Sequence, residues 1–292
     1  MVPLDLVGLT SLMKLTSGER GIAIGLIDGP VATDHPALTA ESIRRLPGGG
    51  PCLMPESPAC RHGTFIAGIL VARRGGAAPA ICPGCTVIAR PVFAETTSDG
   101  QHPPSATAPQ LATAICECVD AGVRVLNLSA GMSQPSTRQE RELNSALDYA
   151  AGHGILVVVA AGNQGTLGSS ALTRHPWVIP VVGYGMDARP MAQSNLGSSM
   201  GKRGLGAPGE NVTSLSPQGG LQTQGGTSVA AAFVTGAIAL LWSRFPKAGV
   251  AEIKRAVTGG YGPRRTSVVP PLLDAWGAHQ TLSATQSARA TQ

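Results

Sequence analysis

The chain is poor in charged residues, in aromatic side chains and in long apolar runs. Only 13% of its 292 residues are charged, and 3% are aromatic. The longest apolar stretches, within 154–162 and 229–242, are too short or too interrupted by small residues to cross a bilayer. The few aromatic side chains, with no basic run longer than two residues, argue against nucleic-acid binding. We therefore expect neither a nucleic acid nor a membrane as a partner.

The sequence also lacks the features of fibrous, disordered and secreted chains. It contains 38 Gly and 23 Pro without a repeating period and carries a net charge of +5, which excludes collagen, coiled coils and charge-rich disorder. The N-terminal segment Met1–Met13 has no basic residue before its apolar stretch, unlike a secretory signal. These features predict a soluble, compact globular protein that is rich in small residues.

The six cysteines are even in number but too sparse for a disulfide scaffold. Buried free thiols, paired disulfides and a four-cysteine zinc site all remain open. Two residues apart on an expected helix, Cys116 and Cys118 point about 200° from each other, which argues against zinc. We expect this pair to lie close to Cys82 and Cys85, so that a disulfide could form between the pairs. The remaining two cysteines are Cys52 and Cys60.

Short apolar segments alternate with helical patterns along the chain. The expected strands are almost entirely apolar, as in sheets covered on both faces, and comprise 22–28, 87–93, 124–128, 155–160 and 178–182. The expected helices are 62–72, 109–120, 137–153, 227–244 and 249–257. This alternation predicts an α/β fold with a parallel sheet wrapped by helices. We expect one domain over residues 1–280 and a disordered polar tail over 281–292.

Four polar residues stand where expected strands end or expected helices begin. Asp28 ends the first strand, and Asn163 follows the fourth. His62 is expected to cap the start of a helix, and Ser228 lies near the positive end of the next small-residue helix. Each residue alone is also typical of a turn or a cap. Together they supply the orienting acid, base, oxyanion donor and nucleophile that acyl transfer requires.

These residues and their surroundings resemble the subtilisin-like serine proteases. The order Asp, His, Ser along the chain is the order known in subtilisin. The resemblance spans about residues 5 to 280 and rests on Ile24-Gly25-Leu26-Ile27-Asp28, His62-Gly63-Thr64, Ala160-Ala161-Gly162-Asn163 and Gly226-Thr227-Ser228-x-Ala230. It implies a three-layer fold with a mostly parallel central sheet flanked by helices, and serine endopeptidase activity.

Within this family the chain is similar to the cyanobactin maturation proteases, which trim ribosomally made precursor peptides. The similarity rests on Leu26-Ile27-Asp28-Gly29-Pro30-Val31, Asp34-His35-Pro36, Arg45-Leu46-Pro47, Pro91-Val92-Phe93 and 207–212. It implies a peptide or precursor peptide as the partner, no cofactor, no metal and a cytoplasmic location. The oligomeric state stays open.

The resemblance also implies a role for each site residue. Ser228 would attack the scissile carbonyl, His62 would take its proton, and Asp28 would hold the imidazole. The Asn163 side-chain amide and the Ser228 backbone N–H would bind the oxyanion. The substrate cleft would be framed by Ser129, Ala130, Gly131, Ala160, Ala161, Gly162, Gln164 and Ser170. Because Gln164 is neutral where relatives can place a carboxylate, we expect a neutral or apolar side chain before the scissile bond.

Two positions depart from the family pattern. Ala232 stands four residues after Ser228, where the family usually has proline. This replacement is expected to allow a shift in the turn that orients Ser228. Phe65 replaces a frequent second histidine. Segment 72–83 lacks the side chains for a calcium loop.

The alternatives to a processing protease are a degradative subtilase and a catalytically silent module that binds peptides in the same cleft.

Overall fold

One parallel sheet forms the centre of the protein. The computed structural model describes residues 2–39, 41–47, 49–95, 105–129, 131–132, 137–259 and 266–290. Within them, seven strands pair in the order β2-β3-β1-β5-β7-β8-β9, and every pair is parallel. The strands are β1 (Ala23–Asp28), β2 (Ile43–Arg45), β3 (Thr86–Pro91), β5 (Val125–Leu128), β7 (Leu156–Ala160), β8 (Ile179–Tyr184) and β9 (Leu205–Pro208). The order reverses beside β1, where a ligand crevice is expected in an open α/β sheet.

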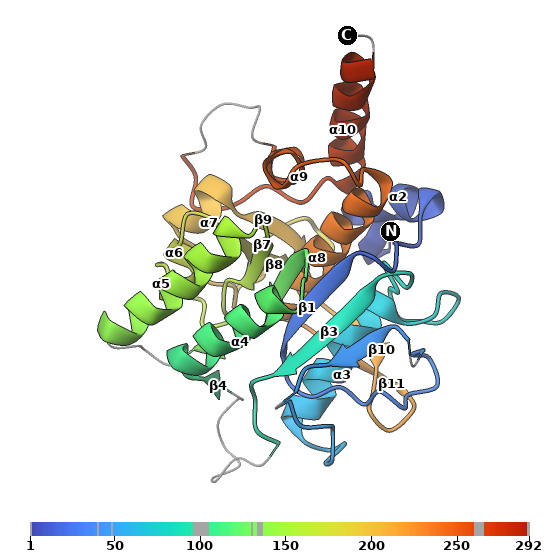
Figure 1. Ribbon diagram of the computed structural model, residues 1–292, viewed down its shortest axis with the longest axis vertical. Helices are drawn as coiled ribbons and strands as arrows, with labels where there is room; N and C mark the ends of the chain where they lie inside the picture. Colours follow the sequence, from blue (N-terminus) through green and yellow to red (C-terminus); the bar gives the residue numbers. More distant parts are fainter. Residues whose placement is uncertain are drawn as a thin grey trace.

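Helices cover both faces of this sheet, so that two separate apolar cores form (Figure 1). On one face lie α4 (Ala108–Asp120) and α5 (Thr137–Gly152), and on the other lie α3 (Pro58–Val71) and α8 (Thr227–Arg244). Leu26 belongs to the core beside α8, whereas its neighbour Ile27 belongs to the core beside α4. Burial on both faces explains why the strand sequences are almost entirely apolar. The predicted three-layer α/β fold is confirmed.

Smaller elements surround the three layers. An antiparallel hairpin packs against α3, and a short parallel pair of strands lies near the N-terminus of α4. The elements are α1 (Pro3–Leu6), α2 (Leu9–Leu15), β4 (Ser105–Ala106), β6 (Gly131–Met132), α6 (Ala171–Arg174), α7 (Ser198–Arg203), β10 (Val212–Leu215), β11 (Leu221–Gln224), α9 (Val250–Thr258) and α10 (Ala275–Ala290).

Two sequence-based expectations about helix ends are wrong. Helix α3 begins at Pro58, where the Ser57 hydroxyl accepts a hydrogen bond from the Cys60 N–H, so His62 lies inside the helix rather than capping it. The tail expected to be disordered is helical as far as Ala290. Leu282 is buried there, and Arg289 pairs with Glu252 on α9 at 2.9 Å. Packing against α9 therefore stabilises a segment whose composition alone does not predict a helix. The single-domain boundary at residue 280 stays a prediction.

The cysteines do not pair as expected. Cys52 and Cys60 form a disulfide, with their Cα atoms 5.5 Å apart, and the other four cysteines are free thiols. Cys82 and Cys85 belong to the core beside α8, whereas Cys118 belongs to the core beside α4. Because the sheet separates these two cores, the expected proximity of the two pairs is wrong. The same separation excludes the four-cysteine zinc site.

Helix α8 is long and apolar enough, by length and composition, to cross a membrane. However, 89% of its apolar window is buried inside the protein. It packs against β5, β7, β8 and β9, as well as against α3. These contacts identify α8 as the central core helix of the fold.

Candidate active site

Three residues that lie far apart in the sequence form a continuous chain of hydrogen bonds. Asp28 is the last residue of β1, His62 lies on α3, and Ser228 is the second residue of α8. The Asp28 Oδ1 is 2.6 Å from His62 Nδ1. On the other side of the ring, His62 Nε2 is 2.9 Å from the Ser228 Oγ. Both distances are normal for hydrogen bonds, so the acid, the base and the nucleophile are connected through a single imidazole.

Two glycines allow the acid and the base to meet. A Cβ atom at Gly63 would lie 2.3 Å from the Gly29 carbonyl oxygen and 2.5 Å from that of Pro30. A Cβ atom at Gly29 would lie 1.9 Å from the carbonyl oxygen of Ala59 on α3. The helix therefore lies directly against the backbone that follows β1. No other residue type permits this approach, which places His62 beside Asp28.

The buried carboxylate of Asp28 controls the charge of the imidazole. Asp28 is fully buried and also accepts a hydrogen bond from the Gly29 N–H at 2.6 Å. Burial has the largest single effect on the pKa of His62, and it lowers this pKa. The negative charge of Asp28 and the hydrogen bond that it accepts from the ring both raise the pKa, and their combined effect exceeds that of burial. The pKa of His62 is consequently raised above its usual value. The site thus stabilises the protonated, imidazolium form of His62.

Two hydrogen-bond donors lie beside the nucleophile. The Asn163 Oδ1 accepts a hydrogen bond from the Thr227 N–H at 2.9 Å, which orients the side-chain amide. Within the described residues, no hydrogen bond uses the Nδ2 of Asn163. The Ser228 N–H lies in the first turn of α8, where backbone donors have no acceptor within the helix. Both donors are therefore available for the negative charge that develops when a hydroxyl attacks a carbonyl.

Comparison with known proteins agrees with this geometry. The sequence profile of the subtilase family, peptidase S8, matches residues 19–259. The chain belongs to the subtilase family. Subtilisin BL of Lederbergia lenta is 30% identical over 243 residues, which cover 80% of this subtilase and 81% of the relative. Subtilisin E of Bacillus subtilis (strain 168) is 26% identical over 240 residues. This match covers 80% of the chain, and the chain spans only 58% of the length of subtilisin E and of the similar Subtilisin J.

Solved structures place the subtilase beside peptide maturation proteases. The protease domain of PatA superimposes with a TM-score of 0.81 at 26% identity, covering 92% of this chain and 97% of that domain. The prenylagaramide maturation protease PagA gives a TM-score of 0.81 at 26% identity, covering 95% and 99%. The expected similarity to the cyanobactin maturation proteases is thereby confirmed.

A residue without any sequence signal, Asn195, organises the loop that follows Asn163. The Asn195 Oδ1 accepts hydrogen bonds from the N–H groups of Gln164 and Thr166 at 3.0 and 3.1 Å. Its Nδ2 donates to the Gln164 Oε1 at 2.7 Å. Asn195 lies 31 positions from Gln164, so no local pattern could have indicated this contact. The expected role of Gln164 in the substrate pocket stays a prediction.

Three of the expected cleft residues, 160–162, lie at the end of β7 or directly after it. Ala160 ends β7 and is half-buried, and Ala161 follows it in a buried position. The Gly162 N–H donates to the Thr227 Oγ1 at 3.1 Å, which joins this segment to the start of α8. Sequence reasoning missed this contribution of Thr227, although the residue stands in the Gly-Thr-Ser motif. The segment 160–162 therefore lies beside the nucleophile, as the resemblance implies.

The other expected cleft residues follow β5 or precede α6. Ser129 is buried and accepts a hydrogen bond from the Asn127 Nδ2 at 2.7 Å. Gly131 belongs to β6, which pairs with β4, and Ala130 lies outside the described residues. Ser170 caps α6, where its hydroxyl accepts a hydrogen bond from the Thr173 N–H. Binding of substrate by these four residues stays a prediction.

The two departures from the family pattern do not disturb the site. Ala232 is fully buried inside α8, which runs without interruption from Thr227 to Arg244. Alanine favours this helix more than proline would, and the Ser228 hydroxyl still reaches the imidazole. Phe65 is fully buried and contributes to the core beneath α3.

Proposed function

We propose that this subtilase is a serine endopeptidase. The observation that carries the proposal is the position of His62, which bridges Asp28 and Ser228 at 2.6 and 2.9 Å. Binding modules have no need for a nucleophile, a base and an orienting acid in this arrangement. The Asn163 Nδ2 and the Ser228 N–H, which have no acceptor among the described residues, favour attack on a carbonyl over simple hydrogen bonding of a ligand.

The reaction follows from this arrangement in two halves. The Ser228 oxygen attacks the carbonyl carbon of the scissile bond while its proton moves to the Nε2 of His62. The amides of Asn163 and Ser228 stabilise the oxyanion. His62 then gives the proton to the leaving amine, and the acyl group stays on the serine oxygen. Water then attacks the acyl carbon while it gives a proton to His62, and the bond between this carbon and the Ser228 oxygen breaks as His62 passes the proton to that oxygen. This step releases the carboxylic acid product and restores the serine hydroxyl.

We further propose that the substrate is a ribosomally made precursor peptide and that the enzyme acts in its proteolytic maturation. The likeness to PatA and PagA over nearly the whole chain supports this role, because PatA is a patellamide maturation protease and PagA a prenylagaramide maturation protease. A degradative subtilase is the second candidate. A maturation protease cuts few sites in a peptide library, whereas a degradative one cuts many.

We also propose that the enzyme is located in the cytoplasm, and the oxidation state of Cys52 and Cys60 tests this location. Glutathione and thioredoxin keep most cytosolic thiols reduced, so Cys52 and Cys60 would be dithiols there. Trapping the thiols with an alkylating agent in intact cells distinguishes the two states. A fully oxidised pair would place the enzyme in an oxidising compartment instead.

A mixed peptide library tests the proposed function. The wild-type chain is expected to cut a small set of peptides after neutral or apolar residues, and Ser228→Ala is expected to cut none. Ser145→Ala is the matched control, since Ser145 is exposed on α5 and, among the described residues, donates to the Arg141 carbonyl of its own helix. Equal cleavage by the wild type and Ser228→Ala would refute the proposal. A dominant preference for Lys or Arg would refute the inference drawn from Gln164.

A further inference from the structure

A cavity lies near the end of β1, which carries Asp28. It has a volume of about 780 Å³, within the range of ligand-binding clefts. Its walls come from the segment before α3, from the segment after β3 and from the first turns of α4. The apolar residues among them are Pro30, Pro51, Leu53, Met54, Phe93 and Pro109. None of these residues belongs to the triad or to its oxyanion donors.

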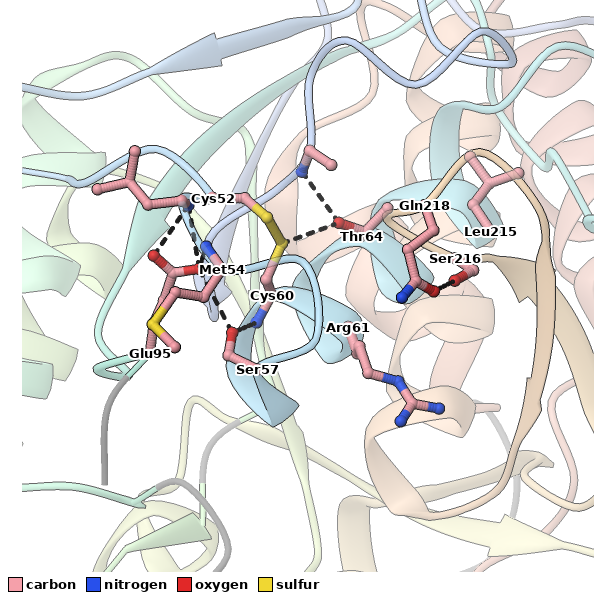
Figure 2. The surroundings of a disulfide bond; sticks show 12 residues. Cys52, Met54, Ser57, Cys60, Arg61, Thr64, Glu95, Leu215, Ser216 and Gln218 are labelled. Atoms are coloured by element: carbon pink, nitrogen blue, oxygen red, sulfur yellow. Dashed lines mark hydrogen bonds between the residues drawn. A yellow bond between two sulfur atoms is a disulfide. The ribbon is translucent and has the colours of Figure 1, made fainter. Parts of the chain in front are cut away.

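A disulfide and a carboxylate stabilise one wall of this groove, the segment 51–54 (Figure 2). The Cys52–Cys60 bond joins the wall to the first turns of α3. The Glu95 carboxylate accepts hydrogen bonds from the Leu53 N–H at 2.9 Å and from the Met54 N–H at 2.9 Å. The hydrogen bonds to Glu95 hold the wall in place before any ligand arrives, and the disulfide adds to this wherever the two cysteines are oxidised, which reduces the ordering cost of binding.

The chemistry of the groove suits an apolar ligand. Leu53 is 74% exposed and Met54 is 47% exposed, although both side chains are strongly apolar. The charged groups that line the groove already have partners. Glu95 accepts the two backbone hydrogen bonds, and Arg90 pairs with Glu117. The groove therefore offers apolar surface without a free charge, and its exposed leucine and methionine gain from being covered.

The groove lies close to the backbone that carries Asp28. Pro30, which lines it, stands two positions after Asp28. The Val92 N–H on the opposite wall donates to the Asp28 backbone carbonyl at 2.8 Å. Cys60 lies on the same helix as His62, two positions before it. These contacts place the groove beside the backbone of the catalytic acid.

We propose that the groove binds an apolar segment of the peptide substrate that lies outside the residues flanking the scissile bond. This inference rests on the proposed function, and it assigns to the groove the selectivity of the enzyme among peptide substrates. Hydrogen bonds between the substrate backbone and the cleft depend little on the substrate's side chains. An apolar groove, by contrast, binds an apolar segment more tightly than a polar one.

Three substrates with the same cleavable core test the proposal. The first is a short chromogenic peptide whose sequence comes from the library experiment. The second carries this core between flanking segments rich in Leu and Val, and the third between flanks of equal length made of Ser and Gly. The wild type is expected to cleave the apolar-flanked peptide about tenfold faster, in kcat/KM, than the Ser/Gly-flanked one. This ratio corresponds to about 1.4 kcal/mol.

The variant Leu53→Asp is expected to abolish this tenfold preference while it leaves kcat/KM for the short core unchanged. Leu15→Asp is the matched control, because Leu15 is an exposed leucine of α2 outside the groove. Equal rates of the wild type on both flanked peptides would overturn the groove proposal, as would an equal loss on all three substrates in Leu53→Asp. If the wild type cleaves none of the three substrates, the proposed function itself fails, which is a different result.

Discussion

The close approach of α3 to the end of β1 makes Gly63 a decisive position. A Cβ atom there would lie 2.3 Å from the Gly29 carbonyl oxygen and 2.5 Å from that of Pro30. Both neighbours are backbone atoms that cannot rotate away, so Gly63→Ala forces the helix to move by about 1 Å to reach ordinary contact distance. The 2.6 Å hydrogen bond between His62 and Asp28 lies beside the same backbone and would be lost or distorted.

We expect Gly63→Ala to lower kcat/KM about 100-fold, the cost known for a displacement of this size in an active site. Overpacking should also lower the free energy of unfolding by about 1–3 kcal/mol. The assays are hydrolysis of the library-derived chromogenic peptide and thermal unfolding. Gly76→Ala is the matched control, because nothing lies within 4 Å of a Cβ atom at Gly76. Normal activity and an unchanged Tm in Gly63→Ala would refute the close-approach argument.

Three further predictions concern the base, the oxyanion donor and the disulfide. Activity, as kcat/KM, should rise with pH through a pKa above the ordinary value of histidine, because His62 must be neutral to act as a base and Asp28 raises its pKa. A flat profile between about pH 5 and 9 would contradict a histidine base. Asn163→Ala should lower kcat about 10²–10³-fold, a magnitude taken over from the corresponding amide of subtilisin, and leave KM nearly unchanged. Asn144→Ala on the exposed face of α5 is its control, and an effect on KM alone would contradict the role. Cys52→Ser opens a disulfide with a sequence separation of 8, so urea unfolding should show a loss of about 2.5 kcal/mol. An unchanged unfolding midpoint would contradict this expectation.

The main elements of the fold could be predicted because their physical signals are local. Strands buried on both faces are uniformly apolar, and this pattern located β1, β5 and β7 to within a residue or two. Helix α8 has the predicted bounds, since its small and apolar residues run without a break. The ends of parallel strands carry the reacting groups of such sheets, so Asp28 and Asn163 could be placed in one site before any contact was known.

The features that could not be predicted depend on contacts between distant segments. Asn195 organises the loop after Asn163 through hydrogen bonds that no local pattern encodes. The partner of Cys52 depends on where α3 begins, and the Ser57-Pro58 signal for that start was overlooked. The short strands β2 and β9 have too few residues to show a period. Helix α10 forms through packing on α9, which its small polar residues do not reveal.

Labelling with a fluorophosphonate tests the central claim most directly, because the reagent reacts only with a serine that an adjacent base activates. The account predicts one adduct per chain, which peptide mass mapping assigns to Ser228. The label should be lost in Ser228→Ala and strongly reduced in His62→Ala, while Ser145→Ala labels as the wild type does. A folded wild-type chain without an adduct, or an adduct on another serine, would contradict the claim that Asp28, His62 and Ser228 form a working catalytic triad.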